Sequence, residues 1–335
     1  MPKKSHAFAI ALLVAPLAGG PAAHAADAAP GAGKTVIPAA QSNDPEEMFQ
    51  TFLVGMGLQD LGYKVQEPIV AQMQAAFVAV ASGDATYYPA FWDPLHSSFL
   101  ANLGSSKVST LGSVVSDSIQ GYLIDKKTAD AHGIETIEQL KDPAIAKLFD
   151  TEGSGKATLY GCDPGWGCER VIEHQLDAYG LRSTVAHKQG SYAALIGDAI
   201  ERIKAGKPTL YYTWTPLWLS SVLVPGKDVV WLTVDKTALP AEQAKATTTV
   251  PGIGNLGFPV NDQRVLVNAA FAKTNPAALK WFETIHVPIE DVNAENLLMH
   301  KGEKSDADIK RHAETWRAAH QAQWDAWLKE ARAAK

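Results

Sequence analysis

The sequence is poor in cysteine, in long apolar runs and in net positive charge, and each shortage excludes a class of protein. Two cysteines among 335 residues are too few for a disulfide-rich scaffold. After residues 1–25 no stretch of 18 or more apolar residues occurs, which excludes a polytopic membrane protein. The formal net charge is −6, which argues against nucleic acid and against an anionic membrane surface as the main partner.

Motifs for catalysis, cofactors and metals are also missing. There is no G-x-S-x-G, no H-E-x-x-H and no cluster of cysteine with histidine. The stretch "GAGKT" at 31–35 is similar to a phosphate-binding loop, but it precedes a strand instead of following one. Residues 150–158, "DTEGSGKAT", begin like a calcium loop but lack its later acidic ligands, so a plain turn is expected. We therefore expect no catalytic residue, no cofactor and no metal site.

Residues 1–25 have the pattern of a cleaved export signal. Lys3 and Lys4 precede the apolar run "AFAIALLVAPLAGG", and "AHA" at 23–25 supplies small residues for cleavage. A retained membrane anchor is the alternative, but the apolar run is short for a bilayer span. We expect an exported, soluble protein that starts near Ala26.

The two cysteines, Cys162 and Cys168, are close in the sequence. In an oxidising compartment such a pair is expected to form one disulfide, and the small ring gives a loop-entropy gain of about 2–2.5 kcal/mol. The alternative is a metal site, which needs more ligands than these two residues supply. The disulfide would fix the shape of the loop that holds Trp166.

The order of the predicted elements is typical of an α/β fold. Strands are expected at 34–39 and 63–70, with a helix at 44–63 between them. Asp44 is the expected N-cap of this helix, and Glu47 is its expected partner in a capping box. Strands and amphipathic helices alternate along the rest of the chain, and the C-terminal tail is expected to be one long helix.

Two stretches share the phrase Trp-x-Pro-Leu, "FWDPLH" at 91–96 and "TWTPLW" at 213–218. In each, an apolar and aromatic strand ends at the tryptophan, Trp92 or Trp214. The aspartate or threonine that follows is the expected N-cap of a helix, and the proline fits the first helical position. Each tryptophan is thus predicted at the carboxyl end of a strand, which is where open α/β sheets bind ligands.

A third tryptophan, Trp166, has a comparable place in the turn "CDPGWGCE", which leads into a helix expected to start at or just after Cys168. Indole faces bind cations, above all quaternary ammonium groups, and helix N-termini bind carboxylates or phosphates. His96 follows Trp92 by four residues and can donate a hydrogen bond to a carboxylate. These features suit a zwitterion with an onium group and a carboxylate.

Other interpretations stay open at this level. On local pattern alone, packing in a core explains Trp92, Trp166 and Trp214 as well as a ligand does, and His96 fits an ordinary hydrogen-bonded role. Packing is the expected role of the other tryptophans: Trp218, Trp231, Trp281, Trp316, Trp324 and Trp327. A secreted carbohydrate-active enzyme is the alternative class, although nothing pairs its candidate carboxylates as glycosidases require: Asp84, Asp93 and Asp163.

The segments that carry these residues resemble one family over essentially the whole mature chain. They include "VASGDATYYPAFWDPLH" (80–96), "EQLKDPAIAKLFDTEGSGKATLYGCDPGWGCE" (138–169) and "GKPTLYYTWTPLW" (206–218). The run Gly-Cys-x-Pro-Gly-Trp-Gly-Cys is highly specific. By these segments the sequence resembles the periplasmic glycine betaine/proline betaine-binding proteins of osmoprotectant ABC importers.

The resemblance implies an α/β fold with two lobes, the type II periplasmic-binding-protein fold. Each lobe would be a mixed sheet flanked by helices, with the ligand in the inter-lobe cleft. Residues 26–121 plus 236–335 would form lobe 1, and residues 122–235 would form lobe 2. The protein would be a monomeric periplasmic receptor, not an enzyme, that delivers its ligand to an inner-membrane permease and its ATPase.

The resemblance also implies the roles of the site residues. A box of three indoles would hold the trimethylammonium group: Trp92, Trp166 and Trp214. The side chain of His96 and backbone N–H groups would hold the carboxylate, those of Gly167 and Cys168. A receptor for choline or another onium compound is the nearer alternative. One departure from the family is Asp93, which replaces a neutral threonine and would repel a ligand carboxylate unless it caps the helix.

Overall fold

The computed structural model describes residue 1, residues 29–42 and residues 45–335. Residues 2–25 of the predicted signal peptide at 1–25 and the predicted N-cap Asp44 therefore lie outside the described residues. Within the described part, no helix combines the length and the apolar character that a membrane crossing needs.

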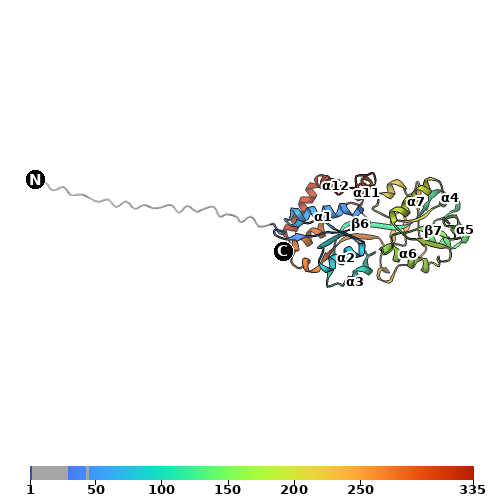
Figure 1. Cartoon of the computed structure of the whole chain (residues 1–335), viewed down its shortest axis with the longest axis horizontal. Helices are drawn as coiled ribbons and strands as arrows, with labels where there is room; N and C mark the ends of the chain where they lie inside the picture. The colour runs from blue at the N-terminus through green and yellow to red at the C-terminus, as the bar shows by residue number, and fades with distance from the viewer. Residues whose placement is uncertain (2–28, 43–44) are drawn as a thin grey trace.

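The first lobe is built on an antiparallel sheet. Strand β13 (Asn261–Asn268) lies between β5 (Tyr87–Asp93) and the first part of β6 (Val108–Asp125). In Figure 1 the helices α1, α11 and α12 lie above this sheet, and α2 and α3 lie below it. The bounds of the helices are α1 Met48–Asp60, α2 Met73–Ser82, α3 Ser97–Leu103, α10 Pro276–Thr284, α11 Ile289–His300, α12 Asp306–Ala319 and α13 Gln321–Ala333.

The second lobe is built on a mixed sheet. The last part of β6 pairs antiparallel with β9 (Leu210–Thr215) and with β10 (Val229–Leu232), whereas β7 (Ala157–Tyr160) pairs parallel with β9 and with β8 (Val185–Lys188). Its helices have these bounds: α4 Lys126–His132, α5 Pro143–Leu148, α6 Gly167–Ala178, α7 Tyr192–Lys204 and α8 Leu219–Val222.

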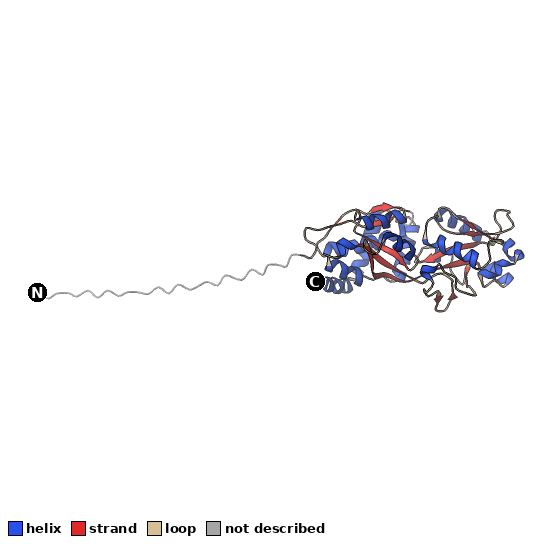
Figure 2. Ribbon diagram, turned by 90° about the horizontal axis from the view of Figure 1, so that it is seen from below, coloured by secondary structure: helices blue, strands red, loops and turns tan. Residues whose placement is uncertain are grey.

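Strand β6 belongs to both lobes. Val108–Ser118 pairs with β13, and the residues from Ile119 onward pair with β9 and β10. Figure 2 shows the long strands inside two groups of helices that are joined at the centre. The prediction of a two-lobed α/β fold is confirmed, and the lobe boundaries at 121/122 and 235/236 stay a prediction.

Short elements connect these layers. They are β1 Thr35–Val36, β2 Ala39–Gln41, the 3₁₀ helix η1 Pro45–Glu47, β3 Lys64–Val65, β4 Ile69–Ala71, η2 Ile137–Lys141, η3 Ala241–Gln243, β11 Thr249–Val250, β12 Gly254–Asn255 and α9 Ala269–Ala272. Strands β1 and β3 pair parallel, as do β2 and β4, which is the predicted β-α-β opening around α1.

One local prediction is wrong. The C-terminal tail is not one helix, because α12 ends at Ala319 and α13 starts at Gln321. The predicted capping box stays a prediction, because its N-cap Asp44 lies outside the described residues, and the side chain of Glu47 bonds to residues of β5.

The close approach of α1 to α10 gives the first testable prediction. A Cβ atom added at Gly57 would lie 1.9 Å from Cζ2 of Trp281, whose ring is fully buried and whose Nε1 donates to the carbonyl oxygen of Val54 (2.9 Å). We expect Gly57→Ala to lower the free energy of unfolding by about 1–3 kcal/mol through overpacking. At Gly55, on the same helix, the nearest atom would lie 3.4 Å away, so Gly55→Ala is the matched control. Urea unfolding of both variants tests this, and equal stability would contradict it.

Candidate functional site

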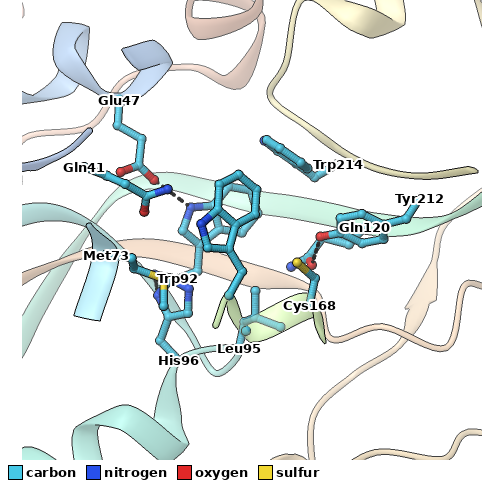
Figure 3. A pocket seen from close by; sticks show the side chains of 12 residues that line it. Gln41, Glu47, Met73, Trp92, Leu95, His96, Gln120, Cys168, Tyr212 and Trp214 are labelled. Atoms are coloured by element: carbon cyan, nitrogen blue, oxygen red, sulfur yellow. Dashed lines mark hydrogen bonds between the residues drawn. The ribbon is translucent and has the colours of Figure 1, made fainter. Parts of the chain in front are cut away.

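One pocket between the two lobes collects all the predicted ligand residues. Figure 3 shows it from close by, with Trp92 on one side and Trp214 facing it from the other. Its lining comprises Gln41, Glu47, Met73, Trp92, Leu95, His96, Gln120, Trp166, Gly167, Cys168, Tyr212 and Trp214. The six predicted residues are thus brought together from three segments that are distant in the sequence.

Trp92 enters the pocket from the end of β5, as predicted. Its indole Nε1 donates a hydrogen bond to Oε1 of Glu47 (3.2 Å). Its backbone N–H donates to Nδ1 of His96 (3.2 Å), and its carbonyl oxygen accepts from the backbone N–H of His96 (2.8 Å). These bonds fix both the indole and the imidazole, which are each less than a tenth exposed.

The predicted helix caps after Trp92 and Trp214 are wrong. A turn with a cis peptide bond before the proline follows each strand, at Asp93-Pro94 and at Thr215-Pro216. The helices begin later, α3 at Ser97 and α8 at Leu219. The carboxylate of Asp93 does not cap a helix but pairs with Nη1 of Arg264 on β13 (3.2 Å). This ion pair offsets the negative charge that Asp93 has in place of a neutral threonine.

Trp166 directly precedes α6, which begins at Gly167, close to the predicted start. The disulfide Cys162–Cys168 closes the turn that carries this tryptophan. A Cβ atom at Gly167 would lie 3.0 Å from Cδ2 of His96 and 2.8 Å from Cγ of Leu95, so the two lobes meet here without room for a side chain. The backbone N–H groups of Gly167 and Cys168 belong to the first turn of α6 and have no intrahelical acceptor.

Trp214 lies in β9 among other aromatic rings. Its ring centre is 5.6 Å from that of Trp166, edge to face, and 4.4 Å from that of Tyr192. Tyr212 is two residues earlier on the same face of the strand, and its hydroxyl donates to Oε1 of Gln120 (2.5 Å), the residue of β6 that pairs with Trp214. Ring packing and the hydrogen bonds of the two tyrosines together orient this wall.

His96 is a neutral hydrogen-bond donor in this pocket. Burial lowers the pKa of its imidazole to about 3. Because Nδ1 accepts the N–H of Trp92, the imidazole proton lies on Nε2. This donor and the first N–H groups of α6 lie at the same end of the pocket, which suits a carboxylate.

Glu47 is the main residue that the sequence analysis missed as part of the site. Its carboxyl is buried in the pocket wall, where it accepts hydrogen bonds from Trp92 Nε1 and from the hydroxyl of Tyr88. Burial raises the pKa of this carboxyl to about 8, with a smaller contribution from the charge of Glu46. Tyr212 was also missed, although strand alternation places it on the same face as Trp214.

Beside the pocket a second set of contacts joins the lobes, and we call it the clasp: Glu46, Leu217, Trp218, Asn293 and His300. The ring of Trp218 stacks on His300 with centroids 3.7 Å apart, and its Nε1 donates to Oε1 of Glu46 (3.1 Å). The backbone N–H of Leu217 donates to Oδ1 of Asn293 (2.9 Å). Trp218 packs against the core as expected, but it is only half-buried and also bridges the second lobe to the first.

The candidate carboxylates of a glycosidase do not converge. Asp84 accepts a hydrogen bond from Ser82, Asp93 pairs with Arg264, and Asp163 accepts the N–H of Tyr192. Among the described residues, none of these three acids lines the pocket.

The carboxylate of Asp150 closes the loop at 150–158 by accepting the loop's backbone N–H groups. Oδ1 of Asp150 accepts the N–H groups of Glu152 and Ser154, both at 3.1 Å, and Oδ2 accepts that of Gly155 at 2.7 Å. The carboxylate that a calcium loop would offer to the ion is thus used for the turn.

This fold and pocket define a class, the two-lobed substrate-binding proteins of ABC importers. Solved structures support the fold. Lactococcal OpuAC in its closed-liganded conformation with glycine betaine superposes with a TM-score of 0.66 at 21% identity, covering 88% of this chain and 99% of that one. A choline-binding protein of an ABC transporter in complex with choline gives 0.67 at 15% identity, with coverages of 89% and 96%.

Sequence comparisons give the family. The family model described as "Substrate binding domain of ABC-type glycine betaine transport system" matches residues 34–319. The chain belongs to this family, whose members are substrate-binding proteins and not enzymes. It is 52% identical to the glycine betaine-binding periplasmic protein OusX of Dickeya dadantii (strain 3937), over 92% of this chain and 93% of that protein. It is 51% identical to the glycine betaine/proline betaine-binding periplasmic protein of Escherichia coli (strain K12), with coverages of 91% and 92%.

Proposed function

We propose that this protein captures glycine betaine or proline betaine in the inter-lobe pocket and delivers it to an ABC importer. The observation that supports this most directly is the convergence of Trp92, Trp166 and Trp214 on one pocket that also contains hydrogen-bond donors for a carboxylate. Family membership and two relatives named for these ligands point the same way.

The energy of such a site is sufficient for capture at low concentration. A desolvated cation–π contact contributes about 2 kcal/mol, and micromolar affinity requires about −8 kcal/mol. Three indole contacts with charge-assisted hydrogen bonds from His96, Gly167 and Cys168 reach this range after the entropy of ordering is subtracted. A quaternary ammonium group has no N–H donor, so an aromatic box selects it through shape and desolvation.

Choline is the second candidate ligand, because the fold is shared with a choline-binding protein. Choline has the same onium head but no carboxylate, so it would leave the donors at the His96 end unpaired. We expect glycine betaine to bind more tightly than choline. Calorimetric titration of both ligands decides between them, and preferential binding of choline would reject the betaine assignment.

A thermal-shift screen provides the wider test of function, with betaines, carnitine, choline and amino acids as ligands. A ligand at a concentration of 100 times its Kd should raise the stability by about 2.7 kcal/mol. A clear shift with betaines and none with amino acids is the expected result. Turnover of a glycoside, or no shift with any onium compound, would contradict the proposal.

Closure of the lobes on the ligand leads to a prediction for the clasp. Trp218→Ala removes the stack on His300 and the bond to Glu46 without touching the pocket, so we expect betaine affinity to fall by up to about tenfold, mainly through faster dissociation. Trp316 is a matched control, because its indole also stacks on a histidine, His320, and donates to a carboxylate, but within the first lobe. Stopped-flow dissociation rates test this, and equal rates in the two variants would contradict it.

The cellular setting is part of the proposal. Residues 1–25 would be cleaved on export, the mature protein would work in the periplasm as a monomer, and its partners would be an inner-membrane permease and the ATPase of the importer. The relatives named above are periplasmic proteins. N-terminal sequencing of the periplasmic fraction tests the cleavage, and light scattering of the purified protein tests the monomer.

A further inference from the structure

The starting point is the buried carboxyl of Glu47, which has two hydrogen-bond donors and, within the described part of the chain, no positive partner. The hydroxyl of Tyr88 and Nε1 of Trp92 donate to its two oxygens. Among the described residues, no positive charge is one of the groups that shift its pKa. A buried carboxylate without a cation is costly, so this arrangement needs an explanation beyond holding Trp92 in place.

The surroundings of Glu47 hold its two protonation states close to balance. The two donated hydrogen bonds favour the ionised form, whereas burial and the nearby charge of Glu46 favour the protonated form. Burial is the larger effect, so the pKa is raised from 4.5 to about 8. A positive charge placed beside this carboxyl would tip the balance toward the ionised form.

The pocket has opposite polarity at its two ends. In Figure 3 Glu47 and His96 lie on opposite sides of Trp92. The donors of His96, Gly167 and Cys168 gather at one end, and the carboxyl of Glu47 lies at the edge of the Trp92 indole at the other. A zwitterion held with its carboxylate at the donors therefore has its cationic head on the Glu47 side.

We propose that Glu47 is the counter-charge for the cationic head of the ligand and that its carboxyl releases a proton when the cation binds. The O–H bond of the carboxyl breaks, the proton passes to the buffer, and the carboxylate remains beside the onium group. This inference rests on the proposed function, because it requires an onium ligand in this pocket.

The other titratable groups around Glu47 are each held in a contact or kept neutral by burial. On β5, Tyr88 donates to it, and in the adjoining turn His96 stays neutral because burial lowers its pKa to about 3. On η1, Glu46 accepts from Trp218. Helix α11 packs against η1 and carries Glu295, which pairs with His312, and His300, which stacks on Trp218. Since histidine is the side chain that most often changes charge near neutral pH, His300→Gln serves as a control for the source of the proton only: its affinity should fall with the stack on Trp218, but its proton release and the direction of its pH profile should match those of the wild type.

The sign of the pH dependence follows from linkage. The free protein holds the Glu47 proton up to about pH 8, and the complex has lost it, so the complex binds fewer protons. Betaine affinity should therefore rise with pH below about 8, by at most about tenfold per pH unit, and level off above that pH. Affinity is lost as the pH falls.

The experiment is calorimetry of glycine betaine at about pH 7 in two buffers of different ionisation enthalpy, together with Kd from about pH 6 to 9. The wild type and His300→Gln should release a fraction of a proton and show the rising profile. Glu47→Gln, which keeps an acceptor for Trp92 but cannot ionise, should bind with no proton release and a flat profile. Choline should also release the proton, because it supplies the same cation.

Each alternative result is distinct. No betaine binding by the wild type would reject the proposed function itself. Betaine binding with no proton release, or equal release by Glu47→Gln, would overturn the role of Glu47 and leave the function standing. If Glu47→Gln does not fold, Tyr88→Phe replaces it: loss of a donor to the carboxylate should shift the rise in affinity to higher pH, and an unshifted profile would overturn the proposal.

Discussion

Replacing Trp214 with alanine is expected to abolish micromolar binding of glycine betaine, and Trp166→Ala should do the same. The two rings meet edge to face with centres 5.6 Å apart, so removal of either one opens the wall of the box to water. Loss of a desolvated cation–π contact costs about 2 kcal/mol, and water at the onium head weakens the remaining contacts. We expect Kd to increase more than about 100-fold, which titration calorimetry or tryptophan fluorescence measures.

The controls separate the loss of the site from the loss of the fold. Trp214 also packs on Tyr192, so circular dichroism should establish that the alanine variant is folded. Trp214→Phe keeps an aromatic face and should retain measurable binding, since phenyl rings bind cations more weakly than indole. Undiminished affinity in both alanine variants would show that the indoles do not hold the ligand.

The second large effect is expected at His96, where two substitutions separate the two ring nitrogens. His96→Asn places an acceptor near Nδ1, so the N–H of Trp92 stays bonded, but the donor at Nε2 is lost. His96→Gln places a donor near Nε2 instead. A hydrogen bond to a charged group contributes about 1.5–3 kcal/mol, so His96→Asn should weaken betaine binding about 10–100-fold. His96→Gln should lose less.

Choline makes the His96 test specific. It has no carboxylate, so its affinity should change little in His96→Asn, whereas that of betaine falls. Because burial keeps His96 neutral, with its pKa lowered to about 3, protonation of this histidine should not alter betaine affinity near neutral pH. Equal losses for choline and betaine would place His96 in the packing of Trp92 and not at the carboxylate.

Local sequence patterns predicted the positions of the three tryptophans at strand ends or before a helix, and the pairing of the two cysteines, because each is encoded within a short run. A strand that ends in Trp-x-Pro-Leu directs its indole to the sheet edge in both lobes, and the two cysteines that flank Trp166 are six residues apart. The convergence of these indoles on one pocket depends on long-range packing. The family resemblance predicted that convergence, whereas residue spacing alone did not.

The failures have the opposite cause. The local pattern around Glu47 gives no sign that its carboxyl accepts hydrogen bonds from Tyr88 and Trp92, which are 41 and 45 residues away. Asp93 satisfies the pattern of an N-cap, but Arg264 on the neighbouring strand, 171 residues away, pairs with it. A cap stabilises by about 1 kcal/mol, so a distant partner for a partly buried acid readily outweighs it.

The passage of β6 through both lobes ties the mechanics of the molecule to its chemistry. Trp92 stands on the sheet that pairs with the first part of this strand, and Trp214 lies opposite Gln120 in the second part. If the lobes rotate apart, the strand must flex near Ile119, and that same movement carries one indole wall away from the other. Opening of the lobes would thus also separate the two aromatic walls, so a ligand held between them would lose both contacts in one movement.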